Sequence, residues 1–318
     1  TLGSDTASIE ELRKLNDAVL EDIYPTKATE NSTQVPLFSY RREGIAAPRV
    51  KSARPKALIP VFPGTNCEYD TQRALLASGA DAQIIVIQNL SAEHVSRSVE
   101  TFAQALKQAQ MVVIPGGFSG GDEPDGSAKF ITAFFRNPAV KEEVTALLEQ
   151  RDGLMLGICN GFQALIKLGL VPYGKIIDTD ESCPTLTYNT IGRHQSKLVR
   201  TRVASNKSPW LAATQVGEVY AVPISHGEGR FLASEELVQR LAANGQIATQ
   251  YVDLNDLPTM DTAFNPNGSI CAIEGITSPD GRVFGKMGHA ERIGPELYRN
   301  VPDRYDIQLF SSAVQYFQ

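Results

Sequence analysis

Cys159 is the residue whose type and position best suit a nucleophile. It follows the apolar run 154–158, which predicts a buried strand, and it precedes a stretch whose apolar residues recur at helical spacing. Gly157 and Gly161 flank it, two residues away on either side. This pattern is typical of a nucleophile elbow, a sharp turn from strand to helix in which a side chain at either glycine would clash. The backbone N–H of Asn160 is then a natural donor to an oxyanion.

A cysteine nucleophile needs a base that takes and returns its proton, and a group that orients this base. Two of the histidines each follow a predicted strand, and each begins an H-x-E triplet: His226 with Glu228, and His289 with Glu291. Side chains two residues apart in extended chain lie on the same side, so either carboxylate could hold its imidazole. Spacing alone leaves the choice between the two triplets open.

A glycine-rich segment, residues 115–122, directly follows the predicted strand 111–114. It lacks the Lys-Ser/Thr ending of a P-loop and the spacing of a dinucleotide fingerprint, so it does not predict a phosphate site. A plain turn would explain the glycines. Alternatively, the glycines allow the backbone to approach a ligand closely. We expect the N–H groups of Gly117 and Asn160 to form an oxyanion hole for acyl transfer.

The composition narrows the functional class. The 318 residues carry a net charge of only −6, which argues against general binding of nucleic acid. No apolar run approaches the roughly 20 residues of a membrane span, and no signal peptide opens the chain, so we expect a soluble cytoplasmic protein. Four scattered cysteines form neither a CxxC pair nor zinc spacing. Reduced thiols and the absence of a metal site are therefore predicted.

The order of predicted elements indicates two parts. Residues 1–55 read as one amphipathic helix over 9–23 and a basic linker, and residues 56–318 read as one enzyme domain. In that domain strands first alternate with helices, which predicts an α/β fold with a parallel sheet whose ligands gather at the carboxyl ends of the strands. After about residue 180 further strands extend the sheet in mixed sense, and a last helix covers 305–317. The expected strands are 57–62, 83–87, 111–114, 154–158, 184–190, 197–203, 219–225, 247–252, 270–277 and 283–288.

Several motifs in residues 56–293 resemble the class I glutamine amidotransferases. They are G-I-C-N-G-F-Q at 157–163, P-G-G-F-S at 115–119 and H-A-E at 289–291. Within that class, I-P-V-F-P-G-T-N-C-E-Y-D at 59–70 and H-G-E-G-R-F at 226–231 are similar to the amidotransferase domain of large single-chain phosphoribosylformylglycinamidine synthases. The resemblance implies a flavodoxin-like three-layer fold with a mixed, mostly parallel sheet around the elbow.

The resemblance also implies roles for individual residues. The catalytic triad would be Cys159, His289 and Glu291, because the family uses the last H-x-E. The residues implied to bind glutamine are Gln163, Ser225, His226 and Gly227. One departure is visible: the family's common P-H-P-E-R stands here as G-H-A-E-R at 288–292, which keeps both catalytic side chains but could loosen their loop.

The activity implied is hydrolysis of L-glutamine to glutamate and ammonia through a cysteine thioester. Ammonia would pass to a synthase domain, in the same or a partner chain, that converts formylglycinamide ribonucleotide to formylglycinamidine ribonucleotide in purine biosynthesis. ATP and Mg²⁺ are expected in that synthase domain, and no cofactor is expected in this one. Two alternatives stay open: a cysteine hydrolase of the related flavodoxin-like superfamily, and an amidotransferase-like domain retained only for assembly.

Overall fold

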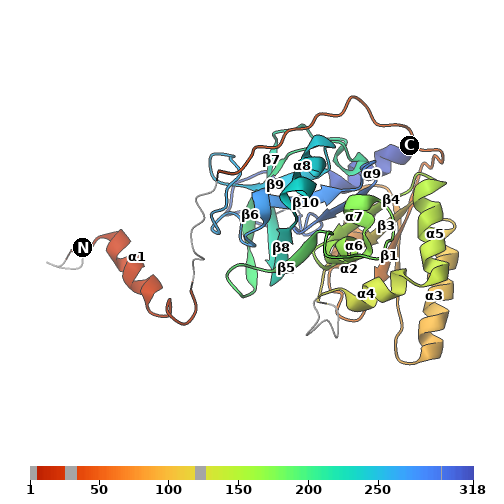
Figure 1. Cartoon of the computed structure of the whole chain (residues 1–318), viewed down its shortest axis with the longest axis horizontal. Coiled ribbons are helices and arrows are strands. Elements are labelled where there is room, and N and C mark those ends of the chain that lie inside the picture. The colour runs from red at the N-terminus through yellow and green to blue at the C-terminus, as the bar shows by residue number, and fades with distance from the viewer. Residues whose placement is uncertain (1–5, 26–33, 119–126, 295) are drawn as a thin grey trace.

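A mixed sheet in the order β2-β1-β3-β4-β11-β10-β9-β6-β7 organises the chain. The computed structural model describes residues 6–25, 34–118, 127–294 and 296–318 (Figure 1). The strands from β2 to β11 in this order pair in parallel, and those from β11 to β7 pair antiparallel. The strands of this sheet are β1 Lys56–Val61, β2 Asp81–Val86, β3 Met111–Ile114, β4 Leu154–Ile158, β6 Gln195–Val203, β7 Val219–His226, β9 Ile247–Val252, β10 Ile273–Thr277 and β11 Val283–Lys286.

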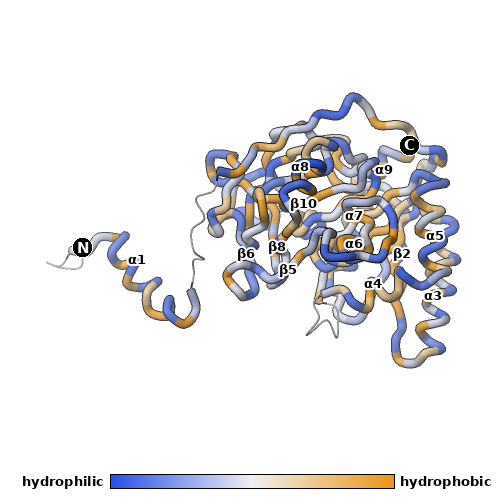
Figure 2. Tube along the Cα trace, in the orientation of Figure 1, coloured by the Kyte–Doolittle hydropathy of each residue, from blue (hydrophilic) through white to orange (hydrophobic). Residues whose placement is uncertain are grey.

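Helices cover this sheet. In the parallel half, α6 packs on β4 and β11, and α2 packs on β1 and β2. In Figure 2 hydrophobic and hydrophilic segments alternate along α3 and α5, as expected for helices that bury one face. The helices are α1 Ile9–Ala18, α2 Glu68–Ala77, α3 Ala92–Leu106, α4 Lys129–Phe135, α5 Pro138–Glu149, α6 Asn160–Leu168, α7 Leu170–Tyr173, α8 Glu235–Ala243 and α9 Leu309–Phe317, with short 3-10 turns at Pro209–Leu211 and Ile270–Ala272.

The predicted α/β class with a mixed sheet is confirmed. Every residue of β3 and of β4 is buried, which explains why both read as continuous apolar runs rather than as alternating patterns. Polar side chains cap α3 and α5: those of Ser91 and Asn137 accept hydrogen bonds from backbone N–H groups in the first turns of their helices. Continuous apolar runs were therefore sufficient to place β3 and β4, whereas α8 was not predicted.

Both terminal helices are shorter than the sequence predicts. The first helix ends at Ala18 rather than at residue 23, and no residue of it is buried. The last helix begins at Leu309 because Gln308, in the left-handed region, interrupts helical geometry before it.

The strand β8 Glu228–Leu232 was not predicted. It pairs with β5 Thr185–Tyr188 in a separate two-stranded sheet, so β5 does not extend the main sheet as expected. The glycine and charged residues of β8 hide its strand character from a pattern search. Its neighbours in space, rather than its own composition, make it a strand.

The basic linker lies against the rest of the chain. Arg42 donates to the carbonyl of Ala212, and Arg49 donates to the carbonyl of Glu149 and pairs with Asp152. Figure 1 shows this segment running over the body before it enters β1. The proposed boundary between residues 55 and 56 stays a prediction. Among the described residues, no helix combines the length and apolar character needed to cross a membrane.

Tight backbone contacts form the turn at Cys159. Its φ of 53° and ψ of −107° are strained for a residue with a side chain. A methyl group added at Gly157 would lie 2.5 Å from the carbonyl oxygen of Gly161, and one added at Gly161 would overlap the carbonyl oxygen of Ile114. The two glycines are therefore required by the approach of α6 to the ends of β3 and β4, as expected for an elbow.

We expect Gly161→Ala to lower the free energy of unfolding by about 1–3 kcal/mol, because the new methyl group can be accommodated only by moving backbone. Urea denaturation followed by circular dichroism measures this. Gly44→Ala is the matched control, since a methyl group there meets no atom within 4 Å. Equal stability of the two variants would contradict the close approach.

Candidate active site

The residues predicted to do chemistry gather at one edge of the sheet. Cys159 follows β4, Gly117 lies beyond the end of β3, and His289 lies beyond the end of β11. Because these three strands are parallel, their carboxyl ends meet. Gly116 marks how close they come. A methyl group there would lie 2.7 Å from His289 Cε1 and 3.3 Å from Cys159 Cβ.

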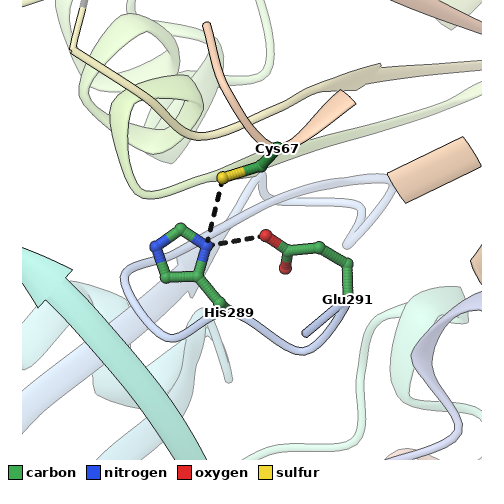
Figure 3. A group of neighbouring side chains, drawn as sticks. All are labelled: Cys67, His289 and Glu291. Carbon is green, nitrogen blue, oxygen red and sulfur yellow. Dashed lines mark hydrogen bonds and ion pairs between the residues drawn. The ribbon is translucent and has the colours of Figure 1, made fainter. Parts of the chain in front are cut away.

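His289 is paired with a carboxylate. Its Nδ1 lies 2.6 Å from Glu291 Oε1, and both side chains are buried. Figure 3 shows the two side chains facing one another across the loop. The backbone N–H of His289 donates to the carbonyl of Pro223 at 2.9 Å. His289 Nε2 has no hydrogen-bond partner among the described residues. This nitrogen is the one left to exchange a proton with a neighbouring group.

The surroundings favour a protonated His289. Burial by itself favours the neutral imidazole, but the Glu291 carboxylate and the thiols of Cys159 and Cys67 outweigh it and raise the pKa of His289 well above its usual value. An imidazole held in this way can keep the proton that a nucleophile gives up. The pair of His289 and Glu291 therefore has the geometry and electrostatics of a base with its orienting group.

His226 has the opposite character. Burial, with a smaller effect from the charges of His289 and His194, lowers the pKa of His226 to about 3. Its neighbour in sequence, Glu228, does not orient it, since Glu228 Oε2 accepts from the backbone N–H of Ser127 at 3.3 Å. Both ring nitrogens of His226 lack hydrogen-bond partners among the described residues. The structure thus distinguishes the two H-x-E triplets, which spacing alone could not do.

A cavity of about 460 Å³ opens beside Cys159. Most of the residues predicted to contact substrate line it, namely Gly117, Asn160, Gln163, His226 and Gly227. Ser225 is not among the lining residues; its carbonyl lies 3.9 Å from Cys159 Sγ, and its hydroxyl lies 3.1 Å from His194 Nε2. The cavity is large enough for one free amino acid.

The side-chain amide of Gln163 is already engaged on both sides. Its oxygen accepts from Asn160 Nδ2 at 3.0 Å, and its nitrogen donates to the carbonyl of Glu228 at 2.6 Å. Gln163 therefore connects the first turn of α6 to β8 and helps to shape the cavity wall. Its contact with substrate stays a prediction.

The backbone conformation at Gly117 favours glycine. Its φ of +147° is rarely adopted by other residues, and a methyl group there would lie 2.7 Å from Thr65 Cα. Gly117 and Asn160 border the cavity on either side of the nucleophile's turn. The assignment of their N–H groups to an oxyanion hole stays a prediction. Residues 119–122, the rest of the glycine-rich segment, lie outside the described residues.

Two charged residues of the cavity were not predicted to bind substrate, namely Arg193 and Glu228. Glu228 was weighed only as a possible orienting group for His226. Their opposite charges in one amino-acid-sized cavity became visible only when β5 and β8 were placed beside α6. The sequence signal that could have found Glu228 is its position in the motif H-G-E-G-R-F.

Cys67 also lies at the site, although its only sequence signal is the motif at 59–70. Its buried Sγ is 3.9 Å from His289 Nδ1 and accepts from Arg292 Nη2 at 2.8 Å. The donor atoms of Cys67, His289 and Glu291 lie within 4.8 Å of one another (Figure 3), a spacing that a metal ion could use. The adjacent guanidinium of Arg292 repels a cation, so this cluster fits a metal poorly. The predicted absence of a metal stays a prediction.

The pH dependence of stability tests the placement of His226. Between pH 6.5, its usual pKa, and its folded pKa of about 3, the unfolded chain binds a proton that the folded chain does not. Stability should therefore fall as the pH falls through this window. In this window the free energy of unfolding should decrease less steeply with falling pH in His226→Gln than in the wild type, by up to about 1.4 kcal/mol per pH unit. Urea denaturation from about pH 6.5 to about pH 4.5 measures the slopes, and parallel slopes would contradict a buried neutral His226.

Comparisons with known proteins give the family of this chain. Residues 54–317 match the model of the CobB/CobQ-like glutamine amidotransferase domain. The phosphoribosylformylglycinamidine synthase subunit PurQ of Symbiobacterium thermophilum is 33% identical over 258 residues, which cover 81% of this chain and 95% of that protein. The subunit of the same name from Methanococcus maripaludis is 31% identical over 286 residues, with 83% and 97% covered.

A solved structure gives the same result for the fold. A chain of the structure of PurLQS from Thermotoga maritima matches with a TM-score of 0.59 at 25% identity, covering 83% of this chain and 100% of that one. The family model spans most of the chain, including the elbow cysteine and the histidine–glutamate pair that the fold brings beside it. This chain therefore belongs to the CobB/CobQ-like glutamine amidotransferase domain family, and it is a glutamine amidotransferase enzyme.

Proposed function

We propose that this chain is the glutaminase part of a phosphoribosylformylglycinamidine synthase. It hydrolyses L-glutamine and supplies ammonia for the ATP-dependent conversion of formylglycinamide ribonucleotide to formylglycinamidine ribonucleotide. The names of its relatives support this assignment. The observation that carries it is the position of Cys159 at the wall of an amino-acid-sized cavity, beside the buried pair of His289 and Glu291.

The ammonia acceptor is a synthase part, in the same chain or in a partner chain, that holds ATP and Mg²⁺. The relatives compared above are named as separate subunits, and the single-chain arrangement rests on the resemblance alone. No cofactor is assigned to the present chain. The route of ammonia would start at the elbow, where the amide nitrogen leaves.

The chemistry follows from the geometry. His289 takes the proton of Cys159, and the sulfur attacks the side-chain carbonyl carbon of glutamine. The N–H groups of Gly117 and Asn160 stabilise the oxyanion, and His289 then protonates the departing nitrogen, which leaves as ammonia. Water, deprotonated by His289, cleaves the thioester and releases glutamate. Glu291 keeps the imidazole in the orientation that both steps need.

Glutamine carries a carboxylate and an ammonium group on its α-carbon. Among the described residues that line the cavity, Arg193 and Glu228 supply one positive and one negative side chain, whereas His226 is neutral near pH 7. We assign Arg193 to the α-carboxylate and Glu228 to the α-ammonium group, because charge-assisted hydrogen bonds are the strong ones. This assignment explains how the site would select a free amino acid over a peptide.

Cys159→Ala and His289→Ala should each lower the glutamine-dependent rate by at least about 10³-fold, since neither can form the thioester. Activity with ammonium salts should remain, because the synthase part is intact. His226→Ala is the matched histidine control, and it should chiefly raise KM for glutamine. The measurement is product formation by the complete enzyme with either nitrogen source.

Two outcomes would contradict this proposal. Normal glutamine-dependent activity of Cys159→Ala would favour a domain retained only for assembly. Failure of a diazo-ketone analogue of glutamine to label Cys159, with the thiol still reactive toward iodoacetamide, would favour a cysteine hydrolase of another specificity. Loss of thioester formation in His226→Ala rather than in His289→Ala would reverse the assignment of the base.

Glu228→Gln and Arg193→Met should raise KM for glutamine by about 10- to 100-fold, the loss expected for one charged hydrogen bond, with a smaller effect on kcat. Glutamine amide, in which a neutral amide replaces the α-carboxylate, should distinguish the two variants. Arg193→Met should use glutamine and glutamine amide with similar KM, whereas Glu228→Gln should still prefer glutamine. Arg240→Met, on the exposed face of α8, is the control. Unchanged KM in both cavity variants would refute the assignment.

A further inference from the structure

A buried ion pair lies directly beneath the histidine loop. Lys286 ends β11 and Glu274 lies in the neighbouring strand β10; their side chains are 1% and 0% exposed, and Lys286 Nζ is 3.1 Å from Glu274 Oε1. Such a pair is a weak source of stability, because removing two charges from water costs about as much as their attraction returns. Its contacts point to another role.

Both charges bond the same residue, Gly288, which precedes His289. Lys286 Nζ donates to the Gly288 carbonyl at 2.9 Å, and the Gly288 N–H donates to Glu274 Oε1 at 2.7 Å. Thr249 donates to the other carboxylate oxygen. The acceptor and donor of Gly288 are thus held by opposite charges, while the N–H of His289 itself is held by Pro223.

Lys286 also contacts the nucleophile through its main chain. The N–H of Cys159 donates to the Lys286 carbonyl at 2.9 Å. One residue therefore bonds Cys159 by its backbone and the loop of His289 by its side chain. A displacement of Lys286 would change the distance between nucleophile and base.

Gly288 is suited to this contact by its size and by its N–H. A methyl group there would lie 2.7 Å from Val222 Cγ1 and 3.0 Å from Glu274 Oε1. A proline would lack the N–H that Glu274 accepts. The sequence G-H-A-E-R, which could loosen the loop, is held in this structure by the ion pair.

We propose that Lys286 and Glu274 are positioning residues, whose ion pair fixes Gly288 and thereby sets His289 against Cys159. The inference rests on the proposed glutaminase function. It predicts that the pair matters for the chemical step and little for glutamine affinity, because neither side chain lines the cavity.

The test replaces the pair by apolar residues of similar size, in the complete enzyme with its synthase part. Lys286→Met alone leaves a buried carboxylate unpaired and should lower both stability and activity. The double variant Lys286→Met/Glu274→Leu removes both charges, so its urea midpoint should return toward that of the wild type. We expect its kcat for glutamine hydrolysis to stay down by about 100-fold, the effect of a misplaced base, with KM within about threefold.

Alkylation of Cys159 by iodoacetamide, followed against pH, gives a readout without glutamine. It should slow in the double variant, since the imidazole is displaced from the sulfur. Arg282→Met is the control: Arg282 precedes the same strand and pairs with Asp152 at 3.0 Å. It should lower the urea midpoint while leaving kcat within about threefold of the wild type.

A double variant with wild-type stability and wild-type kcat would overturn the proposal. If the double variant does not fold, Glu274→Gln decides, because it keeps the size and one acceptor for Gly288. We expect about a 10-fold lower kcat with KM unchanged, and wild-type kcat in this folded variant would likewise overturn the proposal. A wild-type enzyme that uses ammonia but not glutamine would instead refute the glutaminase function.

Discussion

The contact between α6 and the carboxyl ends of β3 and β4 is the constraint on which the site depends. Cys159 adopts a positive φ, which costs energy for a residue with a side chain. Two backbone hydrogen bonds hold it there. The N–H of Cys159 donates to the carbonyl of Lys286, and the N–H of Gln163 donates to the carbonyl of Cys159. Glycine at 161 allows the helix to approach Ile114 closely enough to make this turn. The sulfur is therefore held at the sheet edge by the main chain.

The two buried histidines near that sulfur have pKa values shifted in opposite directions. His289 is buried beside a carboxylate, which raises its pKa, whereas His226 is buried without one, which lowers its pKa to about 3. Burial with a carboxylate thus favours the protonated form of His289, and burial without one favours the neutral form of His226. Next to His289, Lys286 and Glu274 form a buried ion pair, which also makes hydrogen bonds to the backbone of Gly288. Charged groups at this edge therefore contact both the His289 ring and the backbone of the loop that carries it.

The two halves of the sheet contribute different parts of the site. The parallel half brings together the ends of β3, β4 and β11, beyond which lie Gly117, Cys159 and His289. The antiparallel half adds His226 at the end of β7, and the small β5–β8 sheet adds Tyr188 and Glu228 to the cavity wall. The residues proposed to catalyse thus follow parallel strands, whereas Glu228, proposed to bind the α-ammonium group, lies on an addition to them.

The sequence by itself determined the strands around the elbow, the glycine-flanked Cys159 and the existence of two H-x-E triplets. These are local patterns, because burial on both faces makes a strand uniformly apolar and a sharp turn needs glycine. Only the tertiary structure decided that Glu291 orients His289 while Glu228 bonds elsewhere. It also decided that Arg193 faces the cavity, that β8 is a strand, and that Lys286 and Glu274 hold Gly288. Each of these depends on contacts between segments distant in the chain or on side-chain directions in loops. The local pattern of apolar and polar residues contains no information about either.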